Sequence, residues 1–430
     1  MTPPIGVSKG FPALARRIGL PLVLAALGWT LLLGFVEKTG TWCAGGLRGG
    51  GAAPLCYTDI VPLYRNEGFR NDRLPYLEPC VSVGGDPCDE YPPLTMYTMW
   101  LAALVATGPS GFFFANALVL SIAAVVTAIA LYSIAGPRAL YFTLAPTLLL
   151  YAFYNWDLVA VALATLATCA FLSRRDGLAG VLIGLGAAAK LYPALLLIPF
   201  VLQRVRDGEP DRGLRMTGGA AAAWLATNLP FALAAPGGWS GFFRFNASRP
   251  MNVDSLWYVA CRTVRPASGG QCVPPSMINV LAIVLTCAMA AGLWYLKSRR
   301  DPGWAAWTFA FPLLIVFLLT NKVYSPQYSL WLLPWFALLH PRLGQGSSTA
   351  LFLPFAISDV TVFVAELLWF GNRPPVSDAL TLAFALAVVG RDLVLILWIL
   401  AWVRSPTPTP SPSRTAARRI FDADVAHVSA

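Results

Sequence analysis

Charged residues are scarce in this chain. Only 12% of its 430 residues are charged, whereas 57% are hydrophobic. Soluble domains carry about a quarter of charged residues. Apolar runs close to the roughly 20 residues that cross a bilayer recur from one end of the chain to the other. The composition therefore predicts an integral membrane protein and leaves no room for a separate soluble domain.

Histidine is scarcer still, and several familiar motifs are missing. The two histidines are His340, at the end of an apolar run, and His427, near the C-terminus. Acid–base chemistry elsewhere in the chain therefore requires a carboxylate. The sequence has no phosphate-cradling glycine loop, nucleotide-binding fingerprint or metal motif. This argues against a sugar nucleotide bound in the cytoplasm, and we expect neither a cofactor nor a metal.

The formal net charge of +10 does not indicate nucleic acid as a partner. The basic residues form short clusters between apolar runs, which is the bias expected of cytoplasmic loops. The lipid bilayer is the expected partner. The clusters lie at 138, 174–175, 204–215, 297–300, 342 and 404–419.

These clusters predict an all-α polytopic bundle of about 12 transmembrane helices. All basic clusters fall on the cytoplasmic side only if segment 91–107 does not cross the membrane but dips into or lies on its outer face. The cytoplasmic N-terminus is then 1–17, the membrane domain 18–403, and the tail 404–430 disordered, basic and cytoplasmic. Two long outer loops occupy 37–111, with juxtamembrane helices, and 236–276. The predicted spans are 18–36, 112–135, 139–154, 157–172, 178–189, 192–203, 216–235, 277–297, 303–320, 327–340, 349–370 and 379–403.

Six cysteines fall on the predicted outer side in three close pairs. Disulfides persist outside the cytoplasm, so bridges between neighbours are the favoured interpretation, although other pairings remain open. A metal site is the alternative, but the spacing is not of the Cys-x2-Cys kind and no histidine is nearby. The favoured pairs are Cys43 with Cys56, Cys80 with Cys88, and Cys261 with Cys272.

Asp59 is the first candidate for chemistry. It lies in the sequence Cys-Tyr-Thr-Asp-Ile of the first outer loop. One interpretation is an N-cap that accepts hydrogen bonds from the first free N–H groups of a short interfacial helix. The other is a general base that removes a proton from an acceptor hydroxyl.

Two lysines interrupt apolar runs beside a proline. Lys190 precedes Leu-Tyr-Pro and Lys322 precedes Val-Tyr-Ser-Pro. An irregular backbone at membrane depth is tolerated where protein or a water-filled cavity lines it. An ammonium group there suits a lipid phosphate, to which Arg244 or Arg249 would add a planar donor pair. Snorkelling of each lysine to the headgroups is the alternative.

Further polar residues are expected on the same side as substrate-pocket candidates. Asp157 and Trp156 are explained equally well by helix capping and an interfacial aromatic belt. Asp359, Arg391 and Asp392 predict a structural ion pair between the last two helices. Gly184 and Gly186 predict close helix packing. The pocket candidates are Glu90, Tyr91, Asn155, Asp157, Tyr192, Tyr324, Gln327 and Tyr328.

In order and spacing, several of these elements resemble the GT-C superfamily of polyprenol-phosphate-dependent glycosyltransferases, and within it glycosyltransferase family 87. This family includes actinobacterial mannosyltransferases and arabinofuranosyltransferases of the cell envelope. The elements are Asp59, Tyr-Pro-Pro-Leu at 91–94, Asn-Trp-Asp-Leu at 155–158, Lys-Leu-Tyr-Pro at 190–193 and Ser-Pro-Gln-Tyr-x-Leu-Trp-x-Leu-Pro at 325–334.

The resemblance implies that Asp59 is the catalytic base and that a polyprenyl-phosphate sugar, with mannose favoured, is the donor. It also implies an extracytoplasmic cavity in the cell membrane, inversion at the anomeric carbon, and a glycolipid or polysaccharide acceptor. Some members carry histidines where this chain has 324–328, and this chain has none there. A flippase or transporter of a lipid-linked saccharide is the alternative function, and a structural subunit of an envelope assembly is a third.

Overall fold

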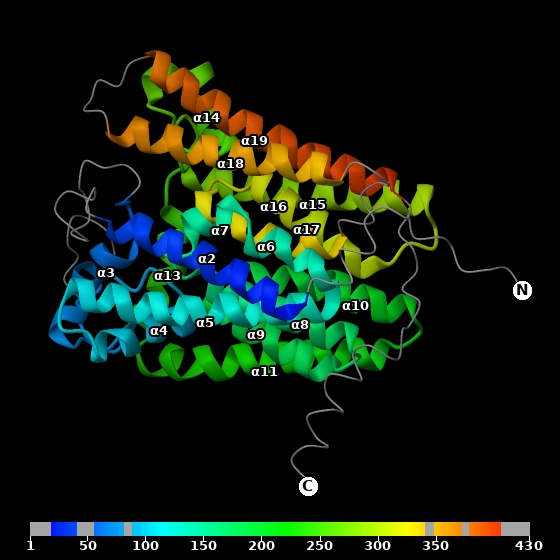
Figure 1. Ribbon diagram of the computed structural model, residues 1–430, viewed down its shortest axis with the longest axis horizontal. Helices are drawn as coiled ribbons and strands as arrows, with labels where there is room; N and C mark the ends of the chain where they lie inside the picture. Colours follow the sequence, from blue (N-terminus) through cyan, green and yellow to red (C-terminus); the bar gives the residue numbers. More distant parts are fainter. Residues whose placement is uncertain (1–18, 41–55, 81–87, 340–347, 372–377, 406–430) are drawn as a thin grey trace, which may run out of the picture.

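The computed structural model describes residues 19–40, 56–80, 88–339, 348–371 and 378–405, and these residues form helices and loops without a strand. Figure 1 shows long helices running side by side. The all-α prediction is therefore confirmed for the described chain. The longer helices are α2 (Leu20–Thr39), α4 (Pro93–Leu104), α5 (Pro109–Ala135), α8 (Asp157–Leu172), α9 (Asp176–Ala189), α10 (Leu197–Arg206), α11 (Pro210–Ala234), α15 (Pro275–Arg300), α16 (Ala310–Thr320), α18 (Ser348–Gly371) and α19 (Asp378–Arg404).

Shorter helices connect the long ones and cap one end of the bundle. They are α3 (Ile60–Asn66), η2 (Phe69–Asn71), η3 (Gly136–Ala139), α6 (Leu140–Thr143), α7 (Pro146–Tyr151), η4 (Tyr192–Leu196), α12 (Pro236–Trp239), α13 (Gly241–Ser248), α14 (Leu256–Val264), η5 (Pro266–Ser268), η6 (Ala306–Phe309), η7 (Pro326–Leu332) and α17 (Leu333–Leu339).

Five described helices are long and apolar enough to cross a bilayer, which confirms the prediction of a membrane protein. They are Leu20–Thr39, Pro109–Thr143, Pro275–Arg300, Ala350–Phe370 and Ala379–Arg404. Three shorter apolar helices are Asp157–Leu172, Asp176–Ala189 and Ala306–Thr320. The number of about 12 crossings stays a prediction. Helix α4 has 12 residues, which cover about 18 Å and fall short of the roughly 30 Å hydrocarbon layer.

The predicted span 139–154 is not one continuous helix. It contains α6 and α7, separated at Leu144 and Ala145. Ala145 is extended, with φ −65° and ψ 129°, because the ring of Pro146 disfavours a helical conformation in the residue before it. The predicted spans 192–203 and 327–340 likewise begin as tighter 3-10 turns, η4 and η7, each with a proline in its first turn.

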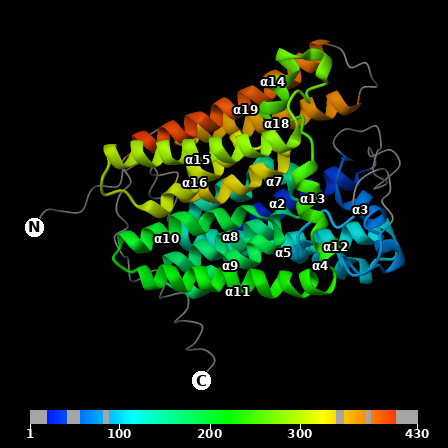
Figure 2. The ribbon, with the colours of Figure 1, turned by 180° about the vertical axis from the view of Figure 1, so that it is seen from behind.

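The two ends of the bundle differ in chemistry. Helices α3, α4, α12 and α13 gather at one end and α10 lies towards the other, as Figures 1 and 2 show from opposite sides. At the α10 end, Arg204 contacts Asp176 at 2.7 Å and Arg212 contacts the same carboxylate at 3.2 Å. Buried Lys297 of α15 donates to the backbone oxygen of Trp402 in α19 at 3.1 Å. Ion pairs and a hydrogen bond thus involve residues of several predicted cytoplasmic clusters at this end.

Arg391 does not form the predicted ion pair between the last two helices. Its Nε lies 3.0 Å from the carboxylate of Asp392, the next residue of α19. Its guanidinium stacks 3.6 Å from the ring centroid of Tyr324 and donates to the backbone oxygen of Asp254 at 2.8 Å. Asp359 of α18 instead accepts a hydrogen bond from Ser329 at 2.6 Å. The prediction of an α18–α19 pair is wrong because both partners find closer groups.

Glycines allow α9 and α11 to pack backbone to backbone. A Cβ atom at Gly180 would overlap the carbonyl oxygen of Met216, and one at Gly184 would overlap that of Ala220. Gly186 faces the ring of Pro193 instead. Small residues at such crossings let helices approach closely in a membrane, so the predicted role of Gly184 and Gly186 in packing is confirmed. This packing fixes the end of α9, where Lys190 follows.

We predict that Gly180→Ala destabilises the protein, because the added methyl group must push α11 away from α9. The expected cost is about 1–3 kcal/mol, as for other overpacked interiors. Gly218→Ala in α11 is the matched control, since a Cβ there meets no atom within 4 Å. Thermal unfolding of both variants in detergent measures the difference. Equal unfolding temperatures would contradict the interpretation of this crossing.

Candidate active site

A cavity of about 630 Å³ lies at the end of the bundle where α3 and α13 are found. Asp59, Lys190 and Lys322 all line it, so the three residues on which the sequence argument depends share one pocket. Aromatic side chains of α13 and α16, Phe242, Phe245 and Phe317, form an apolar part of its wall. The sequence-predicted residues on the wall are Asp59, Glu90, Tyr91, Asn155, Lys190, Tyr192, Arg249, Lys322, Gln327 and Tyr328.

The loop that carries Asp59 docks on the segment between α7 and α8. The backbone N–H of Asp59 donates to the carbonyl of Tyr154 at 2.9 Å, and the Thr58 hydroxyl donates to the carbonyl of Phe153 at 2.8 Å. Asp59 precedes α3, but its side chain makes no capping hydrogen bond. The capping interpretation is therefore wrong, and the carboxylate is free to face the cavity.

Two neutral donors hold the Asp59 carboxylate. The Tyr57 hydroxyl donates to Oδ1 at 2.7 Å, and the Asn155 side-chain amide donates to Oδ2 at 2.8 Å. Burial raises the pKa of Asp59, while the hydrogen bonds from Asn155 and Tyr57 work to lower it. The result is a carboxyl group more basic than usual, with its orientation fixed. A general base needs both properties.

Lys190 begins the break after α9 and already has a partner. Its Nζ lies 2.7 Å from Oδ2 of Asp157, whose Oδ1 accepts from the indole N–H of Trp331 at 2.6 Å. The ammonium also lies 4.7 Å from the ring centroid of Tyr328. Burial works to lower the pKa of Lys190, but Asp157 and further anionic neighbours hold that pKa above its usual value. Lys190 therefore remains charged, with Asp157 compensating its charge.

The indole of Trp156 does not lie in an interfacial belt. Its side chain is fully buried, and its N–H donates to the side-chain oxygen of Asn116 in α5 at 2.7 Å. The Asp157 carboxylate serves Lys190 and Trp331 rather than the start of α8. The interpretation of both residues as a cap and belt is thus wrong, because both side chains turn into the bundle.

Lys322 and Arg249 form a second, uncompensated cationic position. Lys322 is only 5% exposed, and its Nζ donates to the backbone oxygen of Ala247 at 3.1 Å. Among the described residues, no ion pair joins either cation to a carboxylate. Burial, with a smaller contribution from the charge of Arg249, lowers the pKa of Lys322 from 10.5 to about 8. Two neighbouring cations in a cavity favour an anionic ligand.

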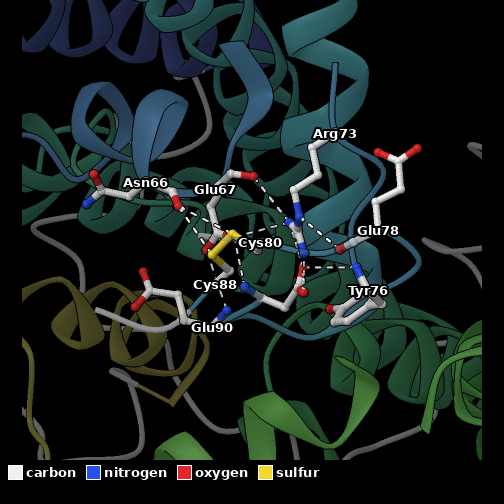
Figure 3. The surroundings of a disulfide bond; sticks show 9 residues. Asn66, Glu67, Arg73, Tyr76, Glu78, Cys80, Cys88 and Glu90 are labelled. Carbon is white, nitrogen blue, oxygen red and sulfur yellow. Dashed lines mark hydrogen bonds and ion pairs between the residues drawn. A yellow bond between two sulfur atoms is a disulfide. The ribbon is translucent and has the colours of Figure 1, made fainter. Parts of the chain in front are cut away.

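Charged side chains, among them Arg73 and Glu67, hold the first outer loop together next to the cavity, and Figure 3 shows this network. Arg73 forms a two-pronged contact with the Asp89 carboxylate, at 3.1 and 2.5 Å. The backbone N–H of Asp89 donates to the Glu67 carboxylate at 2.8 Å. The neighbours of these acids, Asn66 and Glu90, line the cavity. A buried charge network therefore sets the edge of the pocket.

Disulfides reinforce the outer loops. Cys80 is bonded to Cys88 and Cys261 to Cys272, as the spacing predicted. The Cys80 and Cys88 sulfur atoms lie against the backbone oxygen of Asn66, as seen in Figure 3. Cys56 is also disulfide-bonded, and its predicted partner Cys43 lies outside the described residues. The predicted N-terminus 1–17 and residues 406–430 of the predicted tail 404–430 lie outside them too, whereas Arg404 is the last residue of α19.

A known protein family matches the part of the chain that supplies most of the cavity wall. Residues 90–326 match the model of glycosyltransferase family 87. The match covers more than half of the chain. The chain belongs to glycosyltransferase family 87. A comparison with curated proteins gives no significant match.

The matched part of this family 87 glycosyltransferase contains every sequence-predicted cavity residue except Asp59 and Gln327–Tyr328. Asp59 lies outside the match. It lines the same cavity, and it accepts a hydrogen bond from Asn155, a residue inside the match. The family assignment predicted from the sequence elements is thus confirmed, and the chemistry that it indicates is sugar transfer.

Three predicted site residues of the glycosyltransferase do not line the cavity. Arg244 is exposed on α13 and donates to the backbone oxygen of Gly237 at 2.7 Å and to the Ser240 hydroxyl. Tyr324 is 1% exposed beneath Arg391. Asp157 acts through Lys190. Their positions differ from prediction because sequence spacing does not fix the direction of a side chain.

Sequence reasoning missed other cavity residues of the glycosyltransferase. Tyr57 lies two positions before Asp59 and donates to it, yet it was not among the predicted site residues. Asn66 and the phenylalanines of α13 were also missed. The signal for Tyr57 was its closeness in sequence to the candidate base. The others carry no local signal, since folding alone brings them to the pocket.

We predict a pH-dependent contribution of Glu67 to stability. Burial raises its pKa from 4.5 to about 7. Between those values the unfolded chain loses the proton while the folded chain keeps it, so stability falls as pH rises through this window. The contribution of Glu67 to stability is constant below this window and above it. The expected change is about 3 kcal/mol from this group.

Glu67→Gln removes this titration while keeping a polar side chain of the same shape. Unfolding temperatures of the wild type and the variant, measured from pH 4 to pH 8 in one detergent, give the difference directly. The variant is expected to show a flatter profile. Parallel profiles would show that Glu67 does not titrate in this window.

Proposed function

We propose that this glycosyltransferase moves a sugar, mannose on the family resemblance, from a polyprenyl-monophosphate donor to a glycolipid or glycan hydroxyl. The observation that carries the proposal is the composition of one cavity. It holds a basic carboxyl group, Asp59, bound by two neutral donors, and an uncompensated cation pair, Lys322 and Arg249. A base and an anion site are the two parts that such a transfer needs.

The distribution of charge supports an extracytoplasmic reaction. The basic residues of α10, α11 and α15 gather at the end of the bundle away from α3 and α13. Basic loops stay in the cytoplasm, so the cavity opens at the opposite membrane face. A polyprenyl-phosphate sugar in the leaflet at that face can approach the cavity while its tail remains in the bilayer. The phenylalanines of α13 and α16 offer the tail an apolar surface.

The proposed reaction is a single displacement. Asp59 takes the proton of the acceptor hydroxyl as its oxygen bonds to the anomeric carbon. The bond between that carbon and the phosphate oxygen breaks, and its electron pair leaves with the polyprenyl phosphate. Attack opposite the leaving group inverts the anomeric centre. No covalent sugar–enzyme intermediate is needed.

Lys322 and Arg249 are proposed to receive the departing phosphate. When the bond to the sugar breaks, the singly charged phosphodiester of the donor becomes a phosphate monoester with more negative charge. Cations already in place stabilise this charge strongly. The uncompensated pair serves this purpose better than Lys190, whose charge Asp157 already balances. Lys190 still adds positive potential near Asp59 and lowers the pKa of the base relative to a site without it.

We predict that Asp59→Asn lowers transfer at least about 100-fold, the lower range of general-base effects. Proteoliposomes supplied with polyprenyl-phosphate mannose and glycolipids from actinobacterial membranes provide the assay. Asp72→Asn is the matched control. Asp72 lies in the same loop, exposed and with φ +58°, a conformation that asparagine also tolerates.

The same assay separates enzyme from flippase. Labelled donor that crosses the bilayer without transfer would support a flippase, whereas transfer by the wild type supports the enzyme. Near-normal transfer by Asp59→Asn would reject Asp59 as the base. Neither transfer nor movement would favour a structural subunit.

We predict that use of the donor weakens above pH 8 as Lys322 loses its proton. The donor phosphodiester stays singly charged throughout this range, so the lysine is the group that changes. The kcat/KM for the donor is expected to fall about tenfold per pH unit above the pKa. Lys322→Arg keeps the charge and should move this limb to higher pH.

Lys322→Gln should lower kcat/KM for the donor below about pH 8, where the wild-type lysine is charged, and should remove the alkaline limb. Arg265→Gln is the control, an exposed arginine on the same outer segment that does not line the cavity. An alkaline limb that is identical in the wild type and Lys322→Arg would remove Lys322 from the phosphate site.

A further inference from the structure

One side-chain amide connects two polar groups on the cavity wall. The Nδ2 atom of Asn155 lies 2.8 Å from Oδ2 of Asp59 and 2.8 Å from the hydroxyl of Tyr91. Both Asp59 and Tyr91 line the cavity. Since both oxygens bind the same nitrogen, they are close neighbours. A substrate that reaches one of them also reaches the other.

The orientation of this amide is fixed by the backbone. The N–H of Trp156 can only donate, and it contacts Oδ1 of Asn155 at 2.6 Å. The oxygen must therefore face the backbone, which leaves the NH₂ group for Asp59 and Tyr91. Trp156 is itself anchored, because its indole N–H donates to Asn116 of α5 at 2.7 Å. Asn155 is 2% exposed and thus held rigidly.

The direction of each hydrogen bond has a chemical consequence. An amide NH₂ has two hydrogens and no free lone pair, so both Asp59 and Tyr91 accept from it. This hydrogen bond favours the ionised form of Asp59, against the effect of burial. The Tyr91 oxygen uses a lone pair towards Asn155, so its own O–H hydrogen is directed elsewhere, and Tyr91 is one of the residues that line the cavity.

The ring of Tyr91 is also fixed in place. It packs edge-on against Trp156, with ring centroids 5.8 Å apart. Burial, and then the charges of Glu90 and Asp59, raise the pKa of Tyr91 well above its usual value. Its hydroxyl therefore keeps its proton over the working pH range and remains a donor.

We propose that Asn155 is a positioning residue that fixes Asp59 as the proton acceptor and Tyr91 as a hydrogen-bond donor to the neighbouring oxygen of the same acceptor sugar. The proposal rests on the function proposed above. It names the acceptor class as a sugar with adjacent hydroxyl groups. One hydroxyl gives its proton to Asp59 and attacks, while the next accepts a hydrogen bond from Tyr91.

Asn155→Ala tests the first half of the proposal through a pH profile. Without the amide, Asp59 loses one of the two side-chain hydrogen bonds to its charged form, so its pKa rises and the acidic limb of kcat/KM moves to higher pH. At neutral pH we expect a loss of at least about tenfold. Asn155→Asp has the same shape, can still accept from Trp156, and cannot donate when ionised. It should move the limb in the same direction and further, because two carboxylates then face each other.

Tyr91→Phe tests the second half. We expect a KM for the glycolipid acceptor raised about tenfold, an unchanged KM for polyprenyl-phosphate mannose, and an acidic limb in the wild-type position. Tyr57→Phe provides the contrast. It removes a donor to Asp59 without touching Tyr91, so the limb should move while the acceptor KM stays constant.

Each outcome of these assays decides part of the proposal. An acidic limb in the wild-type position in both Asn155 variants would overturn the positioning role. An unchanged acceptor KM in Tyr91→Phe, or a rise in the donor KM instead, would overturn the role of Tyr91. Unfolding temperatures identify variants that fail to fold. If Asn155→Ala fails to fold, the isosteric Asn155→Asp decides the positioning role, and Tyr91→Phe decides the role of Tyr91 independently. Absence of transfer by the wild type is the separate result that rejects the proposed function itself.

Discussion

The hydrogen bond between Asn155 and Asp59 is the contact on which the site depends. It joins a loop outside the bundle to the start of α8, across 96 residues of sequence. Without it, the Asp59 carboxylate would keep only the Tyr57 hydroxyl as a side-chain donor, its pKa would rise further, and its direction would be less firmly set. With it, burial can raise the basicity of the carboxyl group while the bound donors keep its orientation. The packed membrane helices thus hold the proposed base of the loop in a fixed position.

Charge pairing divides the cavity into parts with different chemistry. A buried charge is expensive unless a partner compensates it. Asp157 meets this need for Lys190, and Asp89 meets it for Arg73 in the outer loop. Lys322 and Arg249 have no carboxylate within ion-pair distance among the described residues, and the charge of Arg249 lowers the pKa of Lys322. The paired groups build the pocket, and the uncompensated pair is left to attract an anion.

Several site features followed from short sequence elements. Asp59 was identified by its place in an outer loop, and the lysines by their interruption of apolar runs beside prolines. All three reach one cavity. The partners of these residues were not predictable in the same way. Trp331 binds Asp157 across 174 residues, and Arg391 turned to Asp392 and Tyr324 rather than to Asp359. Such choices depend on the direction of each side chain, which sequence spacing alone does not specify.

The sequence by itself determined the helical membrane fold, the family and the division into a basic end and a polar, cysteine-bearing end. It could do so because transfer into a bilayer depends on local hydrophobicity and charge, summed over about 20 residues at a time. Only the tertiary structure decided which donors bind Asp59, which lysine is paired with a carboxylate and which lysine remains available to bind an anion. Hydrogen bonds and ion pairs act over about 3 Å, and such distances between remote residues exist only after the helices have packed.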